Sequence, residues 1–100
     1  MKVEVNGETL RLSEFPELTA AQAGVFREQA RAALGLGLKN FEIELSQTPY
    51  IDSAGLGALI ALHKTARSRG GTLRLLHPQP AVRQILELTR MHRLFEIVNG

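Results

Sequence analysis

The chain has 100 residues, 44% of them hydrophobic, and a formal net charge of +2. This length and composition predict one globular domain with one core, and the small charge does not indicate nucleic-acid or anionic-membrane binding. Because there is no cysteine, disulfides, thiolate metal sites and cysteine nucleophiles are excluded. The N-terminus does not resemble a signal peptide, and the longest apolar run, residues 54–62, is too short to cross a bilayer. We therefore expect a cytoplasmic protein without membrane insertion.

The first forty residues predict a hairpin and a helix. Residues 3–5 and 9–12 alternate apolar and polar side chains, and Asn6-Gly7 between them is a two-residue turn signal. Residues 19–22 read Thr-Ala-Ala-Gln, which fits a capping box and begins an alanine-rich helix. Its apolar stripe is Ala23, Phe26, Ala30, Ala33 and Leu34.

Strands and helices alternate in the rest of the chain. Strands are expected over residues 41–45, 72–76 and 94–98, and helices over residues 53–69 and from Pro80 onward. Such alternation favours parallel strands joined by right-handed crossovers. The predicted fold is a single α/β domain over residues 1–100. It has a mixed, mostly parallel sheet opened by an N-terminal β-hairpin, with about three helices.

The most informative segment is Tyr50-Ile51-Asp52-Ser53-Ala54-Gly55-Leu56-Gly57, where a strand gives way to a helix. Ser53 can cap that helix with its hydroxyl. The same hydroxyl, if phosphorylated, would place a dianion on the electropositive end of the helix. Two glycines in the first turns weaken a helix, which close approach of another backbone would explain.

Residues 54–62 contain no polar side chain, more than one buried helix face requires. Gly55, Leu56, Leu59 and Ile60 can face a sheet, which leaves a strip toward solvent or a neighbouring element. That strip consists of Ala54, Ala58 and Ala61, and also Leu62 at its border. A docking surface for a partner is one interpretation. Cover by another helix of the domain, or by a second copy in a homodimer, is the other.

The sequence resembles the STAS-domain family of anti-sigma-factor antagonists. The core of the resemblance is residues 51–57, Ile-Asp-Ser-Ala-Gly-Leu-Gly, which look like the family's phosphorylation motif. Gly70-Gly71 before a strand, residues 82–89 and residues 94–97 support it, so the similarity covers about residues 41–98. Residues 16–19, Pro-Glu-Leu-Thr, depart from the family's usual turn. The family also commonly has a further helix after its last strand, whereas this sequence stops at Gly100.

The resemblance implies a protein-binding module rather than an enzyme, with Ser53 phosphorylated by an anti-sigma factor that is itself a serine kinase. The unmodified protein would bind that kinase and so free the sigma factor, and a PP2C-type phosphatase would reset it. Asp52 would support the loop. The implied partner-binding residues are Asp52, Ser53, Ala54, Gly55, Gly57, Ala58 and Ala61.

Two other functions stay open at this point. One is a STAS subunit of a lipid-transport ABC ATPase complex, in which the same helix packs on an ATPase. The other is a small serine hydrolase using Ser53, although a nucleophile elbow needs glycine where Ile51 stands. His63, His77 and His92 have no metal-ligand spacing, so we expect no metal, no cofactor and no direct nucleic-acid partner.

Overall fold

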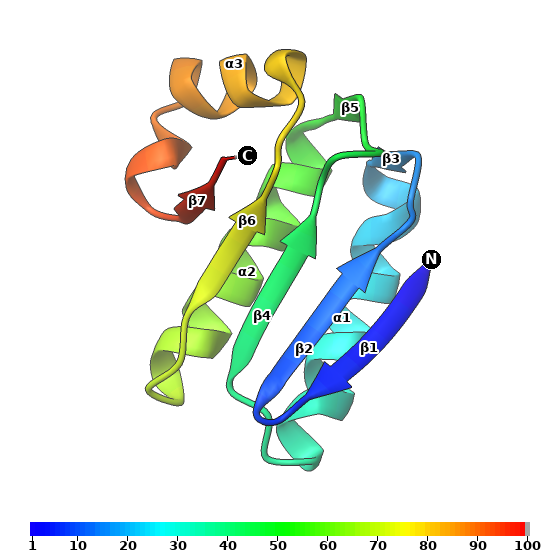
Figure 1. Ribbon diagram of the computed structural model, residues 1–100, viewed down its shortest axis with the longest axis vertical. Coiled ribbons are helices and arrows are strands. Elements are labelled where there is room, and N and C mark those ends of the chain that lie inside the picture. The colour runs from blue at the N-terminus through cyan, green and yellow to red at the C-terminus, as the bar shows by residue number, and fades with distance from the viewer. Residues whose placement is uncertain (100) are drawn as a thin grey trace.

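The computed structural model describes residues 1–99 and contains one five-stranded sheet with the order β1-β2-β4-β6-β7. Its strands are β1 (Lys2–Asn6), β2 (Thr9–Ser13), β4 (Asn40–Glu44), β6 (Leu73–Leu76) and β7 (Glu96–Val98). β1 pairs antiparallel with β2, and the other neighbours pair in parallel (Figure 1). The predicted mixed, mostly parallel sheet with an opening hairpin is confirmed.

A second, two-stranded sheet joins β3 (Glu17–Leu18) to β5 (Tyr50–Ile51) in parallel. It lies beyond the carboxyl ends of β2 and β4, where the chain enters the first two helices (Figure 1). Two-residue strands carry no periodicity, and the sequence did not predict them. They matter because they fix the segment that leads into Ser53.

Three helices complete the fold of residues 1–99, as predicted: α1 (Ala20–Gly35), α2 (Ser53–Ser68) and α3 (Pro80–Leu88), followed by a 3₁₀ turn, η1 (Met91–Arg93). α1 and α2 lie side by side on one face of the sheet, and α3 lies at the carboxyl ends of the strands (Figure 1). The α1 stripe is buried except for Leu34, which is half-buried. The carboxamide Oε1 of Gln22 accepts from the Thr19 backbone N–H at 3.1 Å, which supports the predicted start of α1.

The other face of the sheet carries charges in a regular row. Pairing places one residue from each strand side by side across all five strands: Glu4, Arg11, Glu42, Arg74 and Glu96. The signs alternate along this charge row, and Arg74 lies 3.4 Å from carboxylate oxygens of both Glu42 and Glu96. Opposite charges on neighbouring strands stabilise the pairing.

Two predicted boundaries were wrong. The hairpin turn is Gly7-Glu8 rather than Asn6-Gly7, because Asn6 pairs with Thr9 and Gly7 alone of the turn residues has positive φ (+60°). The last strand spans only Glu96–Val98, because η1 and the turn after it take up the preceding residues. Phe95 of that turn is buried in the core.

Candidate functional site

The candidate site is the junction between β5 and α2. Ser53 is the first residue of α2 and is exposed at the carboxyl-end edge of the main sheet. Open α/β sheets bind ligands at this edge. The predicted location of the serine is therefore confirmed.

Asp52, rather than Ser53, caps α2. The Asp52 carboxylate accepts a hydrogen bond from the Gly55 backbone N–H at 2.8 Å, and the Asp52 carbonyl accepts the Leu56 N–H at 3.0 Å. The interpretation of Ser53 as the cap is wrong, because Ser53 already lies inside the first turn. Among residues 1–99 the side-chain cap of α2 comes from Asp52 and not from the Ser53 hydroxyl, and the backbone N–H groups of Ser53 and Ala54 precede the first intrahelical bond.

The entrance to α2 is held against β3 by backbone contacts. The Leu18 carbonyl accepts a hydrogen bond from the Asp52 N–H at 3.2 Å. A Cβ at Gly55 would overlap the same carbonyl oxygen and would lie 2.8 Å from the Leu18 carbonyl carbon. The predicted close approach of a backbone to this glycine is confirmed, and the backbone is the domain's own β3. Residues 16–19, which depart from the family's usual turn, thus include β3, and β3 contacts the start of α2.

The predicted partner-binding residues fall into three groups by their exposure. Ser53 and Gly57 are exposed, and three others are half-buried: Asp52, Ala54 and Ala61. Gly55 and Ala58 are buried, and their place in a contact surface stays a prediction. Gly55 is covered by β3, and Ala58 by the packing of α2 on α1 and the sheet. The predicted strip is therefore partly covered by the domain itself: Ala58 and Leu62 are buried, whereas Ala54 and Ala61 are half-buried.

Sequence reasoning missed one prominent exposed residue. Tyr50, the only tyrosine, is 55% exposed and precedes Ser53 by three positions. Its neighbour Ile51 is buried, and successive side chains of a strand point to opposite sides. The signal available in the sequence was an isolated aromatic beside the serine, a residue type enriched in interfaces.

A cluster of charged and polar side chains around Glu44 lies near the same edge of the sheet. Glu44 accepts contacts from Arg11 at 3.1 Å and from His77 Nδ1 at 2.9 Å. Burial raises the pKa of Glu44, but hydrogen bonds from His77 and Ser46, with the charge of His77, outweigh it and hold the pKa below its ordinary value. This cluster ties β2, β4 and the residue after β6 together.

The remaining histidines lie apart from Ser53. His63 is half-buried with its ring edge-on to Phe95, 5.7 Å between centroids, and His92 is exposed. Across residues 1–99, no group of three or more histidine, cysteine, aspartate or glutamate side chains is arranged to hold a metal ion. Within the same range, no helix is both long and apolar enough to span a bilayer.

Comparison with known proteins places this geometry in a family. The family model described as "STAS domain" matches residues 1–100. A Thermotoga maritima protein with the name "Putative anti-sigma factor antagonist" is 33% identical over 64 residues, which are 64% of this chain and 57% of that protein. A Bordetella bronchiseptica protein, "Putative anti-sigma factor antagonist BtrV", is 27% identical over 83% of this chain and 72% of its own length. The matched segment thus spans little more than half of the Thermotoga relative.

Solved structures agree with the sequence matches. The crystal structure of a Thermotoga maritima protein described as a "putative anti-sigma factor antagonist" superposes with a TM-score of 0.89 at 26% identity, covering 99% of this chain and 86% of that one. The unphosphorylated anti-sigma factor antagonist SpoIIAA shares the fold, with a TM-score of 0.79 at 18% identity, covering 99% and 87%. The chain belongs to the STAS domain family, and it has the fold of that family's anti-sigma factor antagonists.

Proposed function

We propose that this protein is an anti-sigma factor antagonist controlled by phosphorylation of Ser53. In the unmodified state it binds an anti-sigma factor that is also a serine kinase, and the bound kinase releases its sigma factor. Phosphorylation of Ser53 ends the binding, and a PP2C-type phosphatase restores it. The proposed function is that of a cytoplasmic binding module with no chemistry of its own.

The observation that carries the proposal is that Asp52 caps α2, whereas the next residue, Ser53, is exposed and is not the cap. Asp52 satisfies the Gly55 N–H, so the Ser53 hydroxyl can be modified without removing a helix cap. The hydroxyl is on an exposed residue, where a kinase could reach it. The free N–H groups of the first turn and the helix dipole would stabilise a phosphate in the isolated domain.

The same phosphate would oppose a protein interface. A phosphoserine carries about −1.5 to −2 charges at neutral pH, and it would stand next to the Asp52 carboxylate. In an interface the dianion would lose water, which costs free energy unless a cation pairs with it. A penalty of about 3 kcal/mol weakens binding more than a hundredfold. Control of binding then needs no change of fold.

The names of the relatives, and the phosphorylation states in which one of them was solved, support this proposal. Two curated relatives carry the name anti-sigma factor antagonist. SpoIIAA structures are known in unphosphorylated and phosphorylated forms, with TM-scores of 0.79 and 0.76 to this chain. In that protein both states keep a fold similar to this one.

The test is phosphorylation by anti-sigma factor kinases encoded in the same genome. The intact mass of the protein is measured after incubation with each kinase and ATP, and the modified peptide is sequenced. We expect one phosphate on Ser53, no modification of Ser53→Ala, and normal modification of Ser46→Ala, which removes another exposed serine.

Binding is measured on the same variants. Ser53→Ala should bind the kinase whether or not ATP is present, whereas Ser53→Asp should bind at least tenfold more weakly, the effect of about 1.4 kcal/mol. Equal affinities would contradict the proposal. Stable co-purification with a transporter ATPase, without phosphorylation by any kinase tested, would instead favour the lipid-transport alternative.

A further inference from the structure

A groove runs between α1 and α2 on the outer side of the helical layer. It has a volume of about 220 Å³, and its apolar lining includes Ala30 and Leu34 of α1 with Ala58 and Leu62 of α2. Ala30, Ala58 and Leu62 are buried at its floor. Small side chains on both helices leave this space, because larger ones would fill it.

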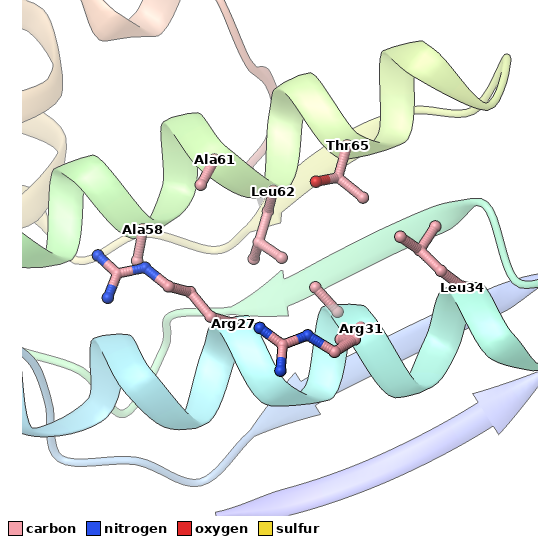
Figure 2. Close-up of a pocket in the computed structure, with 8 residues that line it drawn as sticks. Arg27, Arg31, Leu34, Ala58, Ala61, Leu62 and Thr65 are labelled. Carbon is pink, nitrogen blue, oxygen red and sulfur yellow. The ribbon is translucent and has the colours of Figure 1, made fainter.

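Two arginines stand at one edge of the groove. Arg27 and Arg31 are one helical turn apart on α1 and both line the groove; the Arg27 side chain extends toward α2, and the Arg31 side chain lies along α1 (Figure 2). Both are exposed, and neither forms an ion pair with any carboxylate of residues 1–99. The opposite edge, formed by Ala61 and Thr65 of α2, carries no charge. The groove therefore combines an apolar floor with two unpaired positive charges on one edge.

We propose that this groove seats an acidic amphipathic helix of the protein partner. Its apolar side chains would enter the space between α1 and α2, and carboxylates on one edge would pair with Arg27 and Arg31. The spacing of these arginines, i and i+4, matches carboxylates spaced the same way on a partner helix. This mode of recognition is the helix-in-groove type. The identity of the occupant as part of the anti-sigma factor rests on the proposed function.

The groove and the serine can act on one partner. α2 rises about 1.5 Å per residue, so Ala58 lies about 7.5 Å along the axis from Ser53. The guanidinium of Arg27 lies level with Ala58, and Arg31 lies further along α1 toward Leu34 (Figure 2). A phosphate on Ser53 would repel the acidic helix that the arginines attract. Attraction by the groove and repulsion by the phosphate would thus act on the same charges.

The test uses two synthetic helical peptides with the same pair of leucines four residues apart. One carries glutamates beside the leucines, and the other carries lysines at those positions. Each is titrated into the isotope-labelled full chain and followed by two-dimensional NMR. We expect the acidic peptide to bind about tenfold more tightly, with amide shifts at Ala58, Ala61 and Thr65.

Charge reversal separates the groove from general attraction. Replacing both arginines (Arg27→Glu with Arg31→Glu) should reverse the preference between the peptides. The matched control, Arg67→Glu with Arg93→Glu, changes the net charge equally at exposed sites outside the groove and should keep it. Ser53→Asp should weaken the acidic peptide about twofold at low salt, as expected for charges about 10 Å apart in water.

Several results would overturn the inference. They are equal binding of the two peptides, no binding below about 1 mM, shifts confined to other surfaces, or an equal effect of the control pair. Unchanged affinity of Ser53→Asp would overturn the coupling to the serine. Failure of every kinase to modify Ser53 would remove the proposed function, but it would leave a positive peptide result standing, so the two failures are distinguishable.

Discussion

The Leu18 carbonyl accepts the N–H of Asp52 and occupies the space where Gly55 would carry a side chain. One backbone oxygen of β3 therefore sets both the direction in which the chain enters α2 and the residue type tolerated in its first turn. A strand of two residues holds the serine in place because its contacts are made by backbone atoms.

Gly55→Ala should lower the free energy of unfolding by about 1 to 3 kcal/mol, since the new methyl group forces β3 and α2 apart. Gly57→Ala is the matched control, because nothing lies within 4 Å of a Cβ there. It should raise the free energy of unfolding by about 0.5 to 1 kcal/mol through helix propensity. Urea denaturation of both variants measures the difference, and equal effects would refute the close approach.

Asp52→Ala should destabilise the domain by about 1 kcal/mol, the usual effect of losing an N-cap. Asp52→Asn should retain most of the stability, because its side-chain oxygen can accept the same Gly55 N–H. Ser53→Ala should change the free energy of unfolding by less than about 0.5 kcal/mol. Thermal unfolding of the three variants is the measurement. If Ser53→Ala lowered the free energy of unfolding as much as Asp52→Ala, the serine rather than the aspartate would be the cap.

Tyr50→Ala should weaken kinase binding about tenfold while leaving the fold stable, because exposed tyrosines beside a docking site often carry binding energy. Leu36→Ala is the control, since Leu36 is 74% exposed and lies at the C-terminal end of α1, away from Tyr50 in the sequence. Isothermal titration with the kinase that is proposed to modify Ser53 measures both affinities. Unaltered affinity of Tyr50→Ala would remove this residue from the interface.

Glu44 predicts an acid-sensitive contribution to stability. Its pKa is lower in the folded protein than its ordinary value, so ionised Glu44 favours the native state above that ordinary value. The contribution is lost as the pH falls through the lowered pKa. Glu44→Gln should reduce stability at neutral pH by about 1 kcal/mol and flatten the loss of stability below pH 5. Glu28→Gln, at an exposed position on α1, should leave that acid limb unchanged.

Local sequence signals predicted the elements that depend on nearby residues. Thr19 and Gln22 lie three positions apart and mark the start of α1, and Gly7 marks the hairpin. The alternating residues of β4 predicted a strand with one buried side. These signals work because hydrogen bonds and periodicity over a few residues decide the outcome.

The remaining features depend on residues that are distant in the chain. Leu18 meets Gly55 across 37 positions, and Glu42 meets Arg74 across 32, so no local pattern reveals either contact. Ala58 was predicted to be accessible to a partner, because the sequence does not show whether a small apolar residue packs under a neighbouring helix or faces solvent. Arg27 and Arg31 were recognised as lining a groove only from the packing of α1 beside α2.

Capping by Asp52 has a consequence for how this family can diversify. Asp52, which caps the helix, and Ser53, which is proposed to be modified, are adjacent but separate residues. A replacement of Ser53 by threonine, alanine or an acidic residue therefore removes no anchoring bond. A single substitution at position 53 could therefore create, alter or remove the proposed phosphorylation site while the fold is kept.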